Sequence, residues 1–331
     1  MEKQKMIKSV ELHITNACTH KCPYCYMNAN MNPEQIRHSD LKVVEQILIK
    51  LKKANVETIA LLGGDPVQHP NIIEIFQLIH NLGMKVSIMS NTMEIHKNEE
   101  AANLIDNIDA TFHGRNAKEH DAFCGCSGAY EVLLNNLKFY NDRGVNVNIA
   151  INITPQTYNK MYEIVESVIK RGINVGAVLT QRILPNGRAI GTNVWYASAA
   201  QVNIALSQVV QAEKDFGIDI GVEDPYPFCA IKEEYHKYMH GCPEGTTRLA
   251  VGMNGEVTKC GADPHFSQYN VLKDSLDYIW NNSNLFDDFR EKNFLPKECK
   301  ECKYFERCGG GCPICCQNCI KSMKRIQSLG V

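Results

Sequence analysis

The sequence predicts an α/β protein in which parallel strands alternate with crossover helices, followed by a smaller cysteine-rich region. The first observation is that short β-rich runs alternate with helical patterns from Lys8 to about Gln181, which is typical of parallel strands joined by helices. The second is an apolar share of 44% in 331 residues, which is ample for a packed core. The third is that nine of the fifteen cysteines lie in residues 242–331.

Six short runs rich in β-branched and apolar residues are the candidate strands. Six βα units in a row form either an open doubly wound sheet or a partial barrel, and periodicity alone does not separate these two architectures. The candidate strands are Ser9–Thr15, Thr58–Leu62, Lys85–Ser90, Asp109–Phe112, Val145–Asn152 and Asn174–Thr180.

The segments between these runs carry apolar residues at helical spacing. Ser39 or Asp40 is placed to cap the first helix, and Pro70 opens the second. A glycine follows close to the end of most of them, where helices commonly stop. The predicted helices lie around Leu41–Leu51, from Pro70 to Gly83, over Ser127–Asn141, over Tyr158–Arg171 and over residues 197–217.

The composition changes beyond Gly241, where Gly, Cys and Pro become more frequent. The one long amphipathic pattern in this part of the chain lies around Leu272–Phe289. Apolar burial alone gives such a segment little stability, so we expect metal ligation to supply part of it.

The charge balance and the N-terminus limit where the protein acts. The formal net charge is −2, which argues against a protein that grips a nucleic-acid backbone. No apolar run approaches the roughly 18 residues of a membrane-spanning helix, and Met1–Val10 is too charged for a secretory signal. We therefore expect a cytoplasmic protein that binds neither nucleic acid nor membrane. Disulfides do not persist in that compartment, so closely spaced cysteines indicate metal or iron–sulfur ligands.

A first cysteine group follows the first predicted strand. Cys18, Cys22 and Cys25 form a C-x3-C-x2-C pattern in a loop at the carboxyl end of that strand, where α/β folds build their active sites. Three thiolates within eight residues can hold three irons of a [4Fe–4S] cubane, which leaves one iron open. Zinc sites also use closely spaced cysteines, so the spacing alone leaves zinc as an alternative.

This pattern resembles the hallmark of the radical S-adenosylmethionine (SAM) superfamily, which usually has an aromatic residue before the third cysteine, here Tyr24. A second match follows at the end of the second strand, where Gly63-Gly64-Asp65-Pro66 is similar to the family motif Gly-Gly-Glu-Pro with Asp in place of Glu. In that family the open iron is chelated by the amino and carboxylate groups of SAM. Glycines at such a turn let the backbone approach a ligand closely.

The resemblance implies further polar contacts to SAM from the ends of the later strands. Each of these residues would serve equally well as an ordinary loop residue. They are Ser90 and Asn91 after the third strand, Thr111 and His113 at the fourth, Asn152 at the fifth, and Arg182 with residues 185–189 after the sixth.

The second cysteine group resembles the SPASM domain that many radical SAM enzymes carry. Cys242, Gly255 and Cys260 match the C-x(9–15)-G-x4-C part of that pattern. The C-x2-C-x5-C-x3-C part and a last cysteine follow, at Cys299, Cys302, Cys308, Cys312 and Cys319. The resemblance implies two auxiliary [4Fe–4S] clusters, and hence three clusters in all. Two structural zinc ribbons are the alternative, because they also use C-x2-C pairs.

By analogy with two-cluster ferredoxins, in which the last cysteine of a run serves the other cluster, Cys312 would join Cys242 and Cys260. Cys299, Cys302 and Cys308 would then hold the other cluster together with Cys319. The fourth ligand of the first auxiliary cluster stays open between Cys229, Cys315, Cys316 and a vacant position. Cys124 and Cys126 match neither motif. They are either buried or unreactive thiols, or they supply a thiol that faces the substrate cavity.

The resemblance also implies how the chain divides. Residues 1–195 would form a partial (β/α)6 barrel of the radical SAM type, and residues 196–240 a helical bridge. Residues 241–331 would form the C-terminal cysteine-rich iron–sulfur domain. The fold class expected from the sequence is thus α/β with an auxiliary-cluster domain of the SPASM type.

The activity implied is reductive cleavage of SAM to a 5′-deoxyadenosyl radical, followed by oxidative modification of a peptide or protein. The family precedents are cross-links or thioethers in ribosomally made peptides, and oxidation of Cys or Ser to formylglycine. The formylglycine branch typically places Asp directly after a cluster cysteine, whereas Cys260 is followed by Gly261 and Ala262. The sequence therefore offers only candidates for the proton acceptor, namely Asp263, His265 and Asp121. Of these, we predict that Asp263 and His265 are the catalytic residues.

The alternative enzymatic function is a radical SAM dehydrogenase or maturase that acts on a small molecule or cofactor precursor. The alternative outside the enzymes is a zinc-stabilised binding module that catalyses no reaction. A flavodoxin or ferredoxin is the implied electron donor. Because the first strand begins near residue 9, we expect leader recognition, where it is needed, to come from a separate protein.

Overall fold

The computed structural model describes residues 6–30, 32–95, 97–263 and 267–315. Its central element is a nine-stranded sheet in which β1 to β7 are parallel and lie in chain order. The strands are β1 Ser9–Thr15, β2 Thr58–Gly63, β3 Lys85–Ser90, β4 Asn107–Thr111, β5 Asn146–Asn152, β6 Val175–Gln181, β7 Asp219–Val222, β8 Arg248–Val251 and β9 Val257–Thr258.

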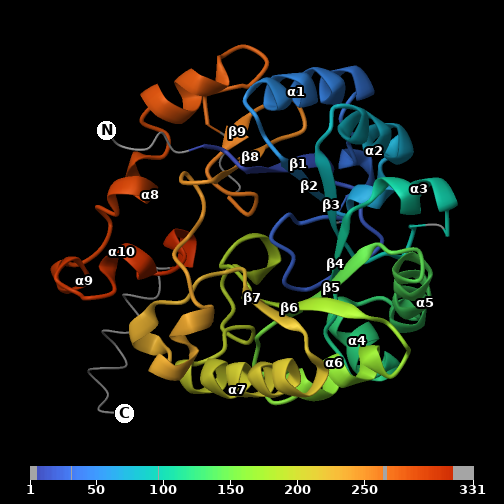
Figure 1. Ribbon diagram of the computed structural model, residues 1–331, viewed down its shortest axis with the longest axis vertical. Helices are drawn as coiled ribbons and strands as arrows, with labels where there is room; N and C mark the ends of the chain where they lie inside the picture. Colours follow the sequence, from blue (N-terminus) through green and yellow to red (C-terminus); the bar gives the residue numbers. More distant parts are fainter. Residues whose placement is uncertain (1–5, 31, 96, 264–266, 316–331) are drawn as a thin grey trace.

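Strand order decides between the two architectures that periodicity left open. Each strand from β1 to β7 pairs with its neighbour in the chain, whereas a doubly wound sheet reverses its order at a switch point. Figure 1 shows the strands curving around an inner side, with α1, α2, α5, α6 and α7 outside. The predicted partial barrel is therefore confirmed, and all six predicted strands lie within two residues of their expected bounds.

Three strands beyond the six predicted ones extend the sheet in the described part of the chain. β7 pairs with β6, and β8 pairs in parallel with the free side of β1. β9 then folds back antiparallel on β8. The C-terminal region is thus joined to the barrel by main-chain hydrogen bonds. The domain boundaries at residues 195 and 240 stay a prediction.

The helices begin and end where local chemistry favours it. Asp40, rather than Ser39, caps α1 by accepting from Lys42 N, while Ser198 and Gln201 form a capping box on α7 that ends at Gly217. The helices are α1 Leu41–Lys53, α2 Ile72–Asn81, α3 Glu99–Leu104, α4 Ala117–Cys124, α5 Ala129–Asn141, α6 Met161–Ile169, α7 Ala199–Phe216, α8 Asp287–Glu291, α9 Lys297–Lys300 and α10 Phe305–Cys308, with short turns η1 Pro33–Gln35, η2 Pro66–Gln68, η3 Gly187–Ala189, η4 Phe228–Ala230, η5 Glu233–Tyr238 and η6 Tyr278–Asn282.

The amphipathic pattern around Leu272–Phe289 does not form one helix. It divides into η6 and α8, separated by Ser283, whose hydroxyl bonds to Ile279 O and whose backbone is extended. A serine that satisfies the preceding turn in this way competes with continuation of the helix. None of the described helices is long and apolar enough to cross a membrane.

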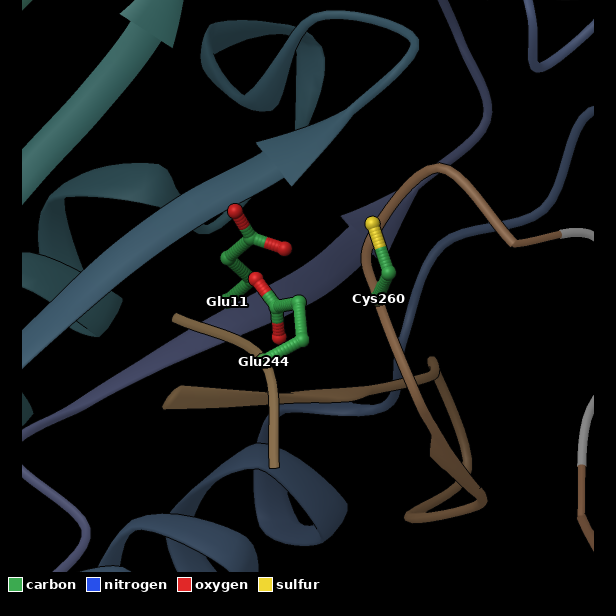
Figure 2. A group of neighbouring side chains, drawn as sticks. All are labelled: Glu11, Glu244 and Cys260. Carbon is green, nitrogen blue, oxygen red and sulfur yellow. The ribbon is translucent and has the colours of Figure 1, made fainter. Parts of the chain in front are cut away.

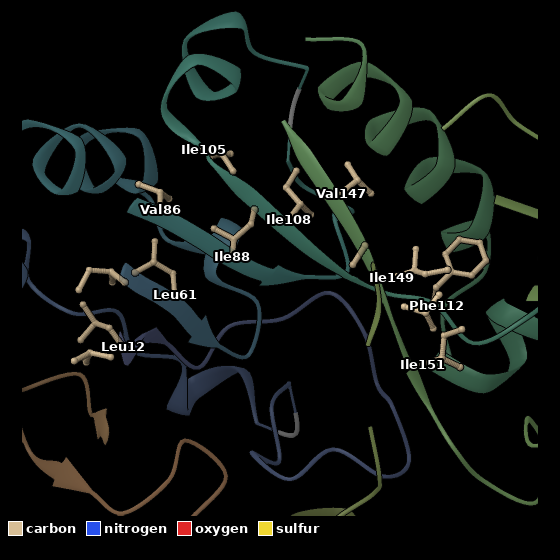
Figure 3. Close-up of a cluster of buried hydrophobic side chains, with 14 of the residues drawn as sticks. Leu12, Leu61, Val86, Ile88, Ile105, Ile108, Phe112, Val147, Ile149 and Ile151 are labelled. Atoms are coloured by element: carbon tan, nitrogen blue, oxygen red, sulfur yellow. The ribbon is translucent and has the colours of Figure 1, made fainter. Parts of the chain in front are cut away.

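The core lies between the sheet and its outer helices. Leu12, Leu61, Ile88, Ile108 and Ile149, one from each of β1 to β5, are fully buried, and Figure 3 shows them side by side along the sheet. In β3, β4 and β5 the buried apolar residues alternate with polar ones, because successive side chains of a strand point to opposite faces of the sheet. On the other face Asn148 Nδ2 donates to Asp109 Oδ1 at 2.9 Å. This packing holds the carboxyl ends of the strands in fixed positions.

We predict that Leu61→Ala destabilises the protein by about 2 to 5 kcal/mol, because it leaves a cavity in this packed layer. The matched control is Ile204→Ala on α7, where the side chain is 43% exposed, and we expect a change within about 0.5 kcal/mol. Thermal unfolding of anaerobically prepared protein measures both. Equal midpoints for the two variants would contradict this description of the core.

Candidate functional site

One cavity opens at the carboxyl ends of the parallel strands. Its volume is about 240 Å³, far above the roughly 10 to 15 Å³ that one water needs. Residues from the ends of six strands, β2 to β7, line it together with residues from the loop after β1 and from the C-terminal region. Its lining includes these predicted site residues: Cys18, Cys22, Cys25, Gly63, Gly64, Ser90, Asn91, Thr111, Asn152, Arg182 and Cys260.

The turn after β2 lies directly against the first cysteine loop. Gly64 N donates to Thr15 O at 3.0 Å, and Asp65 N donates to Ala17 O at 2.7 Å. A Cβ on Gly64 would lie 2.3 Å from Ala17 O, which no side chain tolerates. Only glycine therefore fits at position 64, where the turn packs against Ala17, the residue before Cys18.

Asp65 holds this turn to the end of β3. Its carboxylate accepts from Ser90 Oγ at 2.9 Å, from Asn91 N at 2.8 Å and from Val67 N at 3.2 Å. Burial raises the pKa of Asp65 to about 6 in spite of these hydrogen bonds. Asp65 and Pro66 are predicted SAM contacts, but neither is among the residues that line the cavity. Asp65 instead positions Asn91, whose Nδ2 lies 3.5 Å from Cys18 Sγ.

Arg188 supports the same cysteine loop from the opposite side of the barrel. Its Nε donates to Cys22 O at 2.6 Å and its Nη1 to Ala29 O at 2.7 Å, while its backbone N donates to Cys25 O at 3.0 Å. The segment after β6 was expected to approach SAM. The structure shows that Arg188 reaches back to the loop after β1 and fixes its backbone.

The spacing of the thiols bears on the kind of metal group that they suit. Four thiolates around one zinc ion at 2.3 Å lie about 3.8 Å apart. Among the described residues, no three cysteines bring their Sγ atoms within 4.8 Å of one another. The described cysteines are therefore not arranged around a single zinc ion, and cysteine thiolates are also the usual ligands of iron–sulfur clusters.

The cavity also holds a group of half-buried charged residues, of which the sequence reasoning predicted only Arg182. Glu11, Glu223, Asp224, Arg182 and Arg248 all line it. Arg248 Nη1 lies 3.5 Å from Glu11 and 3.8 Å from Glu223, and Arg182 N donates to Asp224 at 3.0 Å. Burial raises the pKa of both Glu223 and Asp224 above the ordinary range. A carboxylate with a raised pKa is a stronger proton acceptor than an ordinary one.

Behind this wall, Glu11, Glu244 and Cys260 converge, and Figure 2 shows their side chains facing one another. Their ligand atoms lie within 4.8 Å of one another, and Arg248 Nε lies 2.6 Å from Glu244. Burial, with a second contribution from Glu11, raises the pKa of Glu244 to about 8. Burial and the same two carboxyls also raise the pKa of Cys260. A bound metal group would reverse this, because a coordinated thiol loses its proton.

The remaining predicted ligands lie in the C-terminal region. The thiols of Cys242 and Cys260 each interact electrostatically with Cys312, and Cys315 is buried beside Cys312, to which its side chain is hydrogen bonded. Cys299, Cys302 and Cys308 form a separate group around α9 and α10. Cys319 and Cys316 lie outside the described residues.

The predicted proton acceptors do not converge on the cavity. Asp263 follows Cys260 in a turn, with its N donating to Cys260 O at 3.0 Å, but it is not among the cavity-lining residues. Asp121 accepts from Gly128 N and Tyr130 N at the start of α5. His265 lies outside the described residues. Cys124 is buried and Cys126 half-buried, and neither lines the cavity.

Comparison with known families identifies the class of protein that this fold and cavity define. Residues 12–183 match the model of the radical SAM superfamily, and residues 242–303 match that of an iron–sulfur cluster-binding domain, SPASM. The chain therefore belongs to the radical SAM superfamily and carries a SPASM domain. Its cofactors are SAM and iron–sulfur clusters.

Particular relatives cover nearly the whole chain. An AdoMet-dependent heme synthase of Nitratidesulfovibrio vulgaris is 23% identical over 323 residues, covering 92% of this chain and 86% of the relative. A PqqA peptide cyclase of Rhizobium meliloti is 24% identical over 314 residues, covering 90% and 80%. The fold is similar to that of Streptococcus suis SuiB bound to the precursor peptide SuiA, with a TM-score of 0.77, 18% identity and coverage of 96% and 73%.

We predict that Gly64→Ala lowers the iron content by one cluster, about four irons per chain, because the added methyl displaces the backbone beside Cys18. Gly144→Ala is the matched control. Gly144 has a φ of +84° and no atom within 4 Å of the added Cβ, so we expect strain of about 1 kcal/mol and no loss of iron. Iron and sulfide assays on anaerobic protein decide the outcome, and the same iron content in both variants would contradict it.

Proposed function

We propose that this chain uses SAM and three [4Fe–4S] clusters to modify a peptide or protein oxidatively. The observation that carries the proposal is that Cys18, Cys22 and Cys25 share one cavity with Cys260 to Ala262 of the SPASM region. A substrate in this cavity would lie between the site of radical formation and the nearest auxiliary cluster. An electron released from the substrate would then have a short path to an acceptor.

The chain's own residues bind and orient the reactants. Cys18, Cys22 and Cys25 would hold the first cluster, and Gly63 and Gly64 line the cavity in which SAM would bind. Further polar contacts come from the strand ends at Ser90, Asn91, Thr111, Asn152 and Arg182. When bound, the cluster and SAM together supply a radical able to abstract hydrogen from an unactivated C–H bond.

The first auxiliary cluster would be held by Cys242, Cys260 and Cys312. Of the candidates for its fourth ligand, Cys315 has the best support, because it is buried and its side chain contacts that of Cys312. Glu11 and Glu244 disfavour a free thiolate at Cys260, and binding to a metal group would keep that sulfur deprotonated.

The loss of a proton from the substrate also needs an acceptor. Asp263 and His265 remain candidates from the sequence. Glu223 and Asp224 have stronger structural support, because both line the cavity and both have a raised pKa caused by burial. Both follow β7, and Asp224 interacts electrostatically with Tyr26, which directly follows Cys25.

Similarity to the PqqA peptide cyclase and the fold shared with the peptide-bound SuiB support a peptide substrate. Similarity to the AdoMet-dependent heme synthase supports the second candidate, oxidation of a cofactor precursor. An external electron donor of the flavodoxin or ferredoxin type, and a separate leader-binding protein for a peptide substrate, complete the proposal. The family membership argues against a zinc-stabilised binding module.

We predict that Cys22→Ala abolishes formation of 5′-deoxyadenosine, because the SAM-binding cluster loses a ligand. We expect Cys308→Ala to retain part of it, uncoupled from product, because an auxiliary cluster is affected instead. Quantifying 5′-deoxyadenosine under dithionite, without and with substrate, distinguishes the two variants. Complete loss in both would contradict the proposed division of roles.

The substrate class can be tested with peptides encoded by neighbouring genes. Incubated with SAM and dithionite, a true peptide substrate should lose the mass of two hydrogens, and it should not do so with the Cys22→Ala variant. Tandem mass spectrometry locates the modified residue. Unchanged peptides, together with turnover of a small cofactor precursor, would favour the second candidate function.

A further inference from the structure

Four thiols meet where the segment after β7 packs against the C-terminal helices. Cys229 lies in η4, and Cys299, Cys302 and Cys308 lie around α9 and α10. We propose that Cys229 is the fourth protein ligand of the auxiliary cluster held by Cys299, Cys302 and Cys308. This inference rests on the proposed function, which assigns a cluster to those three cysteines.

The first step is that η4 is held firmly against α10. Phe228 N donates to Cys308 Sγ at 3.4 Å, one residue before Cys229. The Phe228 ring lies 5.5 Å from the Tyr304 ring, and the Arg307 guanidinium lies 5.4 Å from the centre of the Phe228 ring. These contacts fix the backbone of Cys229 beside Cys308.

Two further contacts continue this interface on both sides of η4. Cys312 N donates to Pro225 O at 2.9 Å, and η5 contributes His236, whose ring lies 5.0 Å from Tyr304. Gly311 has a φ of +80°, and a Cβ there would lie 2.8 Å from Pro227 N. The close approach of Gly311 and Pro227 shows that the two segments pack backbone to backbone. Figure 1 shows α10 beside the chain that follows β7.

The second step is that the four thiols act on one another electrostatically. Cys229 interacts with Cys302 and Cys308, and Cys299 interacts with all three of the others. Cys229 and Cys302 are exposed, Cys299 is half-buried and Cys308 is buried. The set therefore surrounds a site that opens to the protein surface.

The third step is the way in which the cysteines divide. Between β7 and residue 315 the structure describes eight cysteines, and they fall into two sets of four. One set is Cys242, Cys260, Cys312 and Cys315, next to the cavity. The other is Cys229 with Cys299, Cys302 and Cys308. Each set has the number of thiolates that a [4Fe–4S] cluster binds. The proposal therefore assigns to Cys229 the place that the sequence pattern gave to Cys319.

Iron analysis of cysteine variants tests the assignment in the full chain, purified without oxygen. The wild type should hold about twelve irons and twelve sulfides per chain. Cys229→Ala should lose about four irons, or show the electron paramagnetic resonance signal of a three-iron cluster. Cys319→Ala and the control Cys126→Ala should keep the wild-type content. Because Cys229 is exposed, its truncation leaves no cavity, and the irons that remain report that the fold is intact.

A second measurement avoids substitution altogether. Iodoacetamide alkylation of wild-type protein, read by peptide mass spectrometry, should leave Cys229 unmodified in the iron-loaded form and modify it after the iron is removed by a chelator. An exposed thiol is protected in this way when a metal ligates it. Cys126 should react in both forms.

Alkylation of Cys229 in the loaded protein, or an unchanged iron content and spectrum in Cys229→Ala, would overturn the assignment. Loss of a cluster in Cys319→Ala would overturn it as well, since it would identify Cys319 as the fourth ligand. Zinc without sulfide in the wild type is a different result, because it would overturn the proposed function itself.

Discussion

The backbone contact between Gly64 and Ala17 is the constraint on which the rest of the site depends. It presses the turn after β2 onto the loop that carries Cys18, at a distance where even a methyl group clashes. Asp65 then ties that turn to Ser90 and Asn91. Two neighbouring strand ends and the cysteine loop are thereby held as one unit. Geometry fixed before ligands bind is what a reactive site requires.

A second constraint is electrostatic. Arg248 in β8 lies close to Glu11 of β1, to Glu223 after β7 and to Glu244. It thus connects the first strand, the last strand of the barrel and the SPASM region through one half-buried cation. Unpaired carboxyls would be costly in this setting, so the cation explains how several of them can share a buried wall. Their raised pKa values follow from burial that Arg248 only partly offsets.

The architecture and most of the cavity could be predicted from the sequence because their signals are local. Cysteine spacing, the Gly63-Gly64 turn and polar residues at strand ends all act through neighbours in the chain. Glu223 and Asp224 were missed because β7 is only four residues long and contains Gly221, so its strand end was not recognised. Glu11 and Arg188 act through long-range contacts, and Cys229 joins its group through tertiary packing, for which a single sequence has no periodic signal.

The pairing of β8 with β1 predicts how truncation of the chain would affect the barrel. A fragment that ends after β7 would leave the first strand with a bare row of amide and carbonyl groups along its length. Unprotected strand edges recruit other chains. The barrel part made alone should therefore tend to self-associate, and the SPASM region serves as an edge cover as well as a holder of clusters.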